Sequence, residues 1–106
     1  MPEDVFLALA SPARRRLLEL LADGPKTAGD LAAQFEMSRP SVAEHLTILR
    51  RAALVRDEPV GRQRVYRLEA APLEQVSEWL HPFEQFWRAR LRSMAELLEN
   101  EEEDSP

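Results

Sequence analysis

The sequence lacks cysteine, contains only three glycines and has no long apolar segment. Without cysteine, the chain can form neither disulfides nor thiolate metal sites. Its longest apolar stretches, such as residues 5–10, are far too short to span a bilayer. Two histidines and no glycine-rich loop offer neither a nucleophile–base pair nor a phosphate-binding cradle. We therefore expect neither an enzyme nor a cofactor.

The length of 106 residues predicts a single domain, which we place at residues 1–100. Glu3 and Asp4 stand where a signal peptide would carry basic residues, so export is not expected. Residues 101–106 form an acidic run that is typical of a disordered tail rather than of paired catalytic carboxylates. These features predict a soluble cytoplasmic protein with no membrane insertion.

The charge is unevenly divided along the chain, although the total of −5 at first argues against a nucleic-acid partner. Residues 1–68 hold 11 Arg or Lys and 9 Asp or Glu, a net +2. Residues 69–106 hold 3 Arg or Lys and 10 Asp or Glu, a net −7. The first part can therefore face phosphates while an acidic end lowers the average. The alternative is an ordinary solvated surface with an uneven split.

Residues 27–52 have the pattern of a helix-turn-helix. Thr27 and Asp30 resemble a capping box, and Ser38 with Pro40 is typical of the start of a further helix. In that further helix, apolar residues at helical spacing must face inward. The outward set is then Arg39, Ser41, Ala43, Glu44 and Thr47. An exposed face that begins at a helix N-terminus suits contacts to base edges and phosphates.

Two helices are expected before this unit. Residues 5–10 form a short first helix, and Ser11 with Pro12 caps a second helix that ends at Gly24. Residues 14–16 place three arginines in the first turn of the second helix, where the helix dipole disfavours cations. Phosphate binding or a salt bridge to the acidic tail could offset that cost, and solvated side chains are the alternative.

Residues 54–68 predict a β-hairpin, because alternating apolar and polar residues flank a turn at Gly61. Arg62 and Arg64 lie at or near its tip. Their functional interpretation is contact with phosphate or the minor groove. The alternative is a solubilising loop.

Residues 72–100 predict a C-terminal helix, or two helices broken or kinked near Pro82. Large apolar residues recur there at spacings of three and four, including two Trp and two Phe within nine residues. This is more apolar surface than a small domain needs for its own core, and it predicts a dimer interface. The alternative is that this helix closes the core of the monomer.

An ordered set of motifs resembles the ArsR/SmtB family of bacterial winged-helix repressors, over roughly residues 5 to 98. The motifs are Ala8-Leu9-Ala10-Ser11-Pro12-Ala13-Arg14-Arg15, Asp30-Leu31-Ala32, Ser38-x-x-x-Val42-x-x-His45-Leu46-x-x-Leu49, Leu54-Val55 and Gly61-Arg62-x-x-x-Tyr66-x-Leu68. The resemblance implies a mainly α fold with a small β-hairpin: a winged helix-turn-helix of order α-α-α-α-β-β-α that dimerises through its terminal helices. It also implies a homodimeric repressor that binds a palindromic operator and is associated with the nucleoid through DNA.

The resemblance places DNA contacts on the fourth helix and on the hairpin, or wing. These positions are Ser38, Arg39, Pro40, Ser41, Ala43, Glu44, His45, Arg62 and Arg64. Arg39 is the best candidate for a bidentate guanine contact. Ala43 and Glu44 replace the neutral polar residues common in the family, so no operator preference carries over. Ala53 stands where relatives usually have Gly, which costs about 1 kcal/mol if its backbone is left-handed.

The resemblance also implies a dimer interface formed by the first and last helices. Its residues here are Val5, Phe6, Trp79, Phe83, Phe86, Trp87, Leu91, Met94 and Leu98. Signal input is expected at this interface, because rotating two subunits changes the spacing of the reading helices.

Many family members sense metals, but this sequence lacks most of the ligands. Thr27 and Gly29 stand at the cysteine positions of the third helix, and only His81 and Glu84 match the last-helix zinc site. We therefore expect no metal. A metal-responsive repressor that uses His81 and Glu84 stays open as an alternative, as does a winged helix used for protein contacts. The effector is then an unknown small molecule or a protein or membrane partner.

Overall fold

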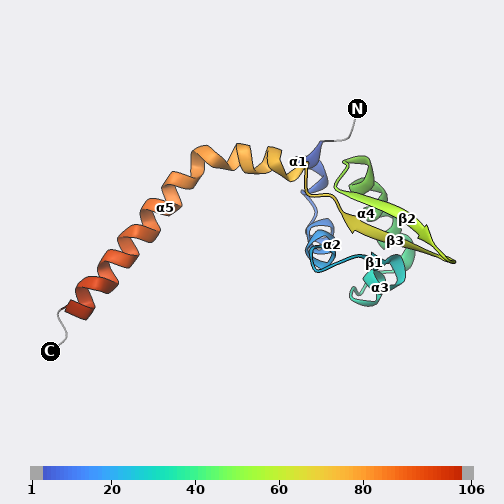
Figure 1. Cartoon of the computed structure of the whole chain (residues 1–106), viewed down its shortest axis with the longest axis horizontal. Coiled ribbons are helices and arrows are strands. Elements are labelled where there is room, and N and C mark those ends of the chain that lie inside the picture. The colour runs from blue at the N-terminus through green and yellow to red at the C-terminus, as the bar shows by residue number, and fades with distance from the viewer. Residues whose placement is uncertain (1–3, 104–106) are drawn as a thin grey trace. The chain divides into compact units, whose positions relative to one another are not determined.

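The computed structural model describes residues 4–103, and the side chains of residues 4–100. The chain forms five helices and three strands in this part (Figure 1). The elements are α1 (Val5–Ala8), α2 (Pro12–Ala22), β1 (Lys26–Thr27), α3 (Ala28–Ala33), α4 (Arg39–Arg51), β2 (Val55–Val60), β3 (Gln63–Leu68) and α5 (Leu73–Glu103). This confirms the expected mainly helical, winged helix-turn-helix architecture.

The structure divides into two compact units, one up to residue 76 and one from residue 77. A single domain over residues 1–100 was expected from the length. Nearly all side chains from 77 to 100 are exposed, so they add little to the core of the first unit, and the single domain stays a prediction. The two units are therefore described separately.

The wing belongs to a three-stranded antiparallel sheet of order β1-β3-β2. β2 pairs with β3 from Val55 opposite Leu68 to Val60 opposite Gln63. The two-residue turn between them begins at Gly61, whose φ of +61° suits a glycine at the first central position. β1 was not expected, because a two-residue strand has no periodicity of its own and exists only by pairing with β3.

The core of the first unit is entirely apolar and joins α1, α2, α3, α4 and β2. Its buried members are Val5, Ala8, Leu17, Leu18, Leu20, Leu21, Leu31, Val42, Leu46, Leu49, Ala52, Leu54 and Val55. Val5 is only 3% exposed. Its assignment to the dimer interface was therefore wrong, because the one turn of α1 directs this side chain into the monomer core.

The helix-turn-helix is capped as the sequence predicted. Thr27 Oγ1 accepts the Asp30 amide at 3.1 Å, and Asp30 Oδ2 accepts the Thr27 amide at 3.3 Å, which completes a capping box. Ser38 Oγ accepts the Ser41 amide at 3.3 Å and caps α4. Both helix starts are thus set by local hydrogen bonds, and Pro40 lies in the first turn of α4, where no N–H is missed.

The C-terminus of α4 closes in a Schellman motif around Ala53. The Leu54 amide donates to the Leu49 carbonyl and the Ala53 amide to the Arg50 carbonyl, both at 3.0 Å. Ala53 has a φ of +60°, so its backbone is left-handed. Ala53 therefore adopts a strained conformation that a glycine would take without cost.

Two of the arginines in the first turn of α2 form the C-terminal cap of α1. Arg14 Nε donates to the Ala8 carbonyl at 2.6 Å, and Arg14 Nη2 donates to the Leu7 carbonyl at 3.1 Å. Arg15 Nη1 donates to the Leu9 carbonyl at 2.8 Å. Cations are stabilised at a helix C-terminus, so the favourable end of α1 offsets the unfavourable start of α2. Neither phosphate nor the acidic tail is needed to explain why Arg14 and Arg15 stand in the first turn of α2.

The last helix, α5, contains Pro82 in its interior, so of the two alternatives for residues 72–100 the chain forms the single helix. Figure 1 shows α5 as one ribbon. It extends to Glu103, which makes residues 101–103 helical instead of part of a disordered tail; residues 104–106 lie outside the described residues. Among the residues that the structure describes, no helix is long and apolar enough to cross a membrane.

Candidate nucleic-acid interface

The side chains on the outward face of α4 differ in how far they are exposed. Arg39, Pro40, Ala43 and Glu44 are exposed, as is the capping Ser38. Ser41 is half-buried, and its hydroxyl accepts a hydrogen bond from Ser38 Oγ at 3.0 Å. Because the two serines bond to each other and to the backbone, they shape the helix start, while the neighbouring side chains are the ones available to a ligand.

Arg39 is the cation at the start of this face. Its side chain lies beside α3, where a methyl group added at Gly29 would approach Arg39 Nη2 to 3.7 Å. No hydrogen bond or ion pair of Arg39 is found within residues 4–100. A guanidinium whose five donors have no acceptor among these residues suits a bidentate contact to guanine or phosphate.

His45 differs from the other expected contact residues because it is half-buried and has an internal neighbour. Arg14 Nη1 lies 3.4 Å from His45 Nδ1. The same guanidinium caps α1, so Arg14 touches both the first helix and α4. We infer that His45 positions α4 against the rest of the first unit and has less freedom to reach DNA than Arg39.

The two wing arginines have different surroundings. Arg62 follows Gly61 in the exposed hairpin turn, and within the described part of the chain it makes no hydrogen bond or ion pair. Arg64 Nη1 lies 2.8 Å from Asp57 Oδ2, and Arg50 Nη1 lies 3.6 Å from the same oxygen. The side chain of Asp57 is only 8% exposed. Arg62 is therefore free for phosphate contact, whereas Arg64 is largely committed to tying β3 to β2.

A broad apolar surface covers one side of α5. Its exposed members are Trp79, Phe83, Phe86, Trp87, Leu91, Met94, Leu97 and Leu98, and in the first unit Phe6 and Leu7 of α1 are exposed as well. The rings of Trp79 and Phe83 lie 5.1 Å apart, centre to centre. Arg90 falls on the same side by helical spacing, since it follows Phe86 by four residues and precedes Met94 by four. We call this set the α5 apolar surface.

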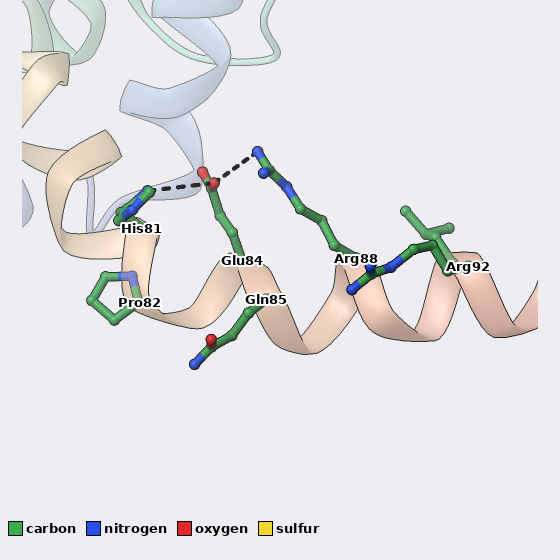
Figure 2. A pocket seen from close by; sticks show the side chains of 7 residues that line it. His81, Pro82, Glu84, Gln85, Arg88 and Arg92 are labelled. Carbon is green, nitrogen blue, oxygen red and sulfur yellow. Dashed lines mark hydrogen bonds and ion pairs between the residues drawn. The ribbon is translucent and has the colours of Figure 1, made fainter.

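A hollow along α5 is lined by His81, Pro82, Glu84, Gln85, Arg88, Leu91 and Arg92, of which Leu91 also belongs to the α5 apolar surface. Figure 2 shows Glu84 between His81 and Arg88, with Oε2 3.8 Å from His81 Nδ1 and 3.0 Å from Arg88 Nη2. Arg88 therefore competes with any cation for this carboxylate. Within the described residues, no group of three or more His, Cys, Asp or Glu side chains is arranged to hold a metal ion.

Comparison with known proteins identifies the chain's relatives. A family model described as "Bacterial regulatory protein, arsR family" matches residues 11–57. The chain is 38% identical over 104 residues to the HTH-type transcriptional regulator Rv2034 of Mycobacterium tuberculosis, covering 98% of this chain and 94% of the relative. The chain belongs to the ArsR family.

Two further comparisons agree. The transcriptional repressor SdpR of Bacillus subtilis is 39% identical over 80 residues, covering 76% of this chain and 89% of the relative. A crystal structure of an ArsR family transcriptional regulator aligns with a TM-score of 0.71 and 35% identity, covering 80% of this chain and 93% of that one. As an ArsR-family member, the protein is a DNA-binding transcriptional regulator and not an enzyme.

Sequence reasoning missed two residues of this ArsR-family interface. Asp57 was not singled out, although an acidic residue in a basic wing is itself a signal that a neighbouring arginine is paired. Arg14 was noticed only as a cation in an unfavourable place. Its carbonyl partners lie six and seven residues earlier in the chain, a separation that no helical periodicity reveals.

Proposed function

We propose that this ArsR-family regulator is a homodimeric repressor that binds a palindromic operator through α4 and the wing, without cysteine-based metal sensing. The observation that carries the proposal is the exposed face of α4, which begins with Arg39 and is accompanied by the free Arg62 on the wing. A guanidinium at the start of a helix can reach base edges, and one at the wing tip can contact the backbone. The rest of the proposed reading segment consists of Ser38, Pro40, Ser41, Ala43, Glu44 and His45.

The α5 apolar surface supports the homodimer. Trp79 is 57% exposed, Phe86 67% and Leu91 60%, although large aromatic and aliphatic side chains are normally buried. If a second copy packed its own α5 apolar surface against this one, the two surfaces would bury each other, as in a two-fold interface. We assign Phe6, Trp79, Phe83, Phe86, Trp87, Leu91, Met94 and Leu98 to this interface, and we place the protein in the cytoplasm, on the nucleoid.

Two substitutions test the division of labour in a gel shift of the promoter of its own operon. Arg39→Ala should lose preference for this promoter over an unrelated duplex, because the guanine contact is removed. Arg62→Ala should weaken binding to both duplexes by a similar factor, because a phosphate contact carries no sequence information. If neither variant changes binding, the assignment of groove and wing is wrong.

The oligomeric state is tested separately by sedimentation equilibrium of the full chain. The proposal predicts a mass of twice 12.2 kDa for the unmodified protein. A monomer at all concentrations would contradict the dimer, and it would leave the DNA-binding function of each winged helix in place.

A further inference from the structure

The reading face of α4 contains one acidic side chain, Glu44. It is exposed, and within the part of the chain described by the structure it has no hydrogen bond or ion pair. Its neighbour Thr47 donates its hydroxyl to the Ala43 carbonyl at 3.0 Å, so that hydroxyl is used inside the helix. Glu44, Thr47, Ile48 and Arg51 line a shallow hollow on this face. Glu44 is thus an unneutralised carboxylate on the surface proposed to approach DNA.

A carboxylate in this place opposes binding to any DNA. Phosphates line both sides of the major groove, and a charge about 7 Å from one phosphate is repelled enough to change affinity about threefold in water. The affinity lost to this repulsion is regained only if a base edge donates a hydrogen bond to the carboxylate. In the major groove, the N4 amino group of cytosine is the donor that Glu and Asp accept from.

We propose that Glu44 is a specificity-determining residue that accepts a hydrogen bond from a cytosine in each operator half-site and weakens binding elsewhere. This inference rests on the proposed function, because it requires α4 to lie in the major groove. Arg39 and Glu44 are five residues apart, which is about 7.5 Å along a helix and corresponds to about two base pairs. Each half-site should therefore hold a cytosine within about two or three base pairs of the guanine that Arg39 contacts.

The experiment is a selection of binding sites from a pool of random duplexes, made with the full-length protein and three variants. Glu44→Gln should change the preference at one position per half-site from cytosine to adenine, because an amide pairs with adenine N6 and N7. Glu44→Ala should accept any base there. Both should bind random duplex about two- to tenfold more tightly, since a dimer loses two negative charges. The control Glu78→Gln removes an exposed carboxylate from α5 and should change neither property.

The outcomes separate this inference from the function on which it rests. An unchanged cytosine preference in both Glu44 variants, with salt-dependent binding intact, would overturn the role of Glu44 and leave the repressor proposal standing. An equal loss of preference at every position would also overturn it, because Glu44 would then support α4 structurally. If the unmodified protein selects no site and its affinity ignores salt, the proposed function itself fails, and this inference fails with it.

Discussion

Replacing Ala53 with glycine should stabilise the protein. Ala53 occupies the left-handed position of the Schellman motif that ends α4, with a φ of +60°. Its Cβ there is close to the following carbonyl oxygen, a conformation that glycine adopts without this clash. The two hydrogen bonds of the motif are made by backbone groups, so Ala53→Gly removes the clash and keeps both of them.

The expected gain follows from two opposing terms. The left-handed conformation costs an L-residue about 1–2 kcal/mol. Glycine loses more backbone freedom on folding, and this entropic cost reduces the gain in stability by about 0.5–1 kcal/mol. The net stabilisation is about 0.5–1 kcal/mol. For a domain of this size, this corresponds to a Tm increase of about 2–8 °C.

Thermal and urea unfolding followed by circular dichroism at one fixed protein concentration measure this effect, because a dimer's Tm depends on concentration. Ala43→Gly is the matched control, since Ala43 is exposed in the interior of the same helix. A glycine there should lower stability by about 1 kcal/mol. A Tm of Ala53→Gly equal to or below that of the unmodified protein, with the control behaving as expected, would refute the reasoning.

Three further substitutions have expected results. Arg14→Ala should lower stability by about 2 kcal/mol in urea unfolding, because two charge-assisted hydrogen bonds to α1 are lost; an unchanged midpoint would show that α1 needs no cap. Asp57→Asn should cost about 1 kcal/mol, a low figure because both arginine partners are half exposed. It should also tighten binding to random duplex by releasing Arg64, and weaker binding would contradict this pairing. Phe86→Glu should shift sedimentation towards the monomer, whereas a stable dimer would exclude Phe86 from the interface.

Much of the reading unit could be predicted because its signals are local. Ser38, Pro40 and the Thr27–Asp30 pair act through hydrogen bonds and backbone limits within four residues, so they identify the helix starts directly. The left-handed backbone of Ala53 was considered only as a possibility, on the family resemblance, and the structure has it with a φ of +60°. The order of helices and strands followed from these boundaries, apart from β1, which depends on a distant strand.

The parts that sequence reasoning missed depend on contacts between distant residues or on close energetic balances. A single helical turn is too short for the spacing of its apolar residues to show which side faces the core. Val5 and Phe6 were therefore both assigned to the dimer interface, although Val5 is buried and Phe6 is 41% exposed. The pairing of Arg64 with Asp57 depends on the strand register, in which Asp57 lies opposite Tyr66, two residues along β3 from Arg64. At Pro82, the cost of about 3 kcal/mol for an interior proline competes with the helix-forming tendency of its flanks, and a pattern cannot decide that balance.

The most direct test of DNA binding by α4 and the wing is the salt dependence of the affinity for the promoter fragment. The logarithm of the association constant should fall linearly and steeply with the logarithm of salt concentration, because several phosphates are neutralised at once. Arg62→Ala should reduce the magnitude of the slope by about 2, since a dimer loses two phosphate contacts at about 0.9 each. A slope near zero for the unmodified protein, or one that Arg62→Ala leaves unchanged, would contradict the account.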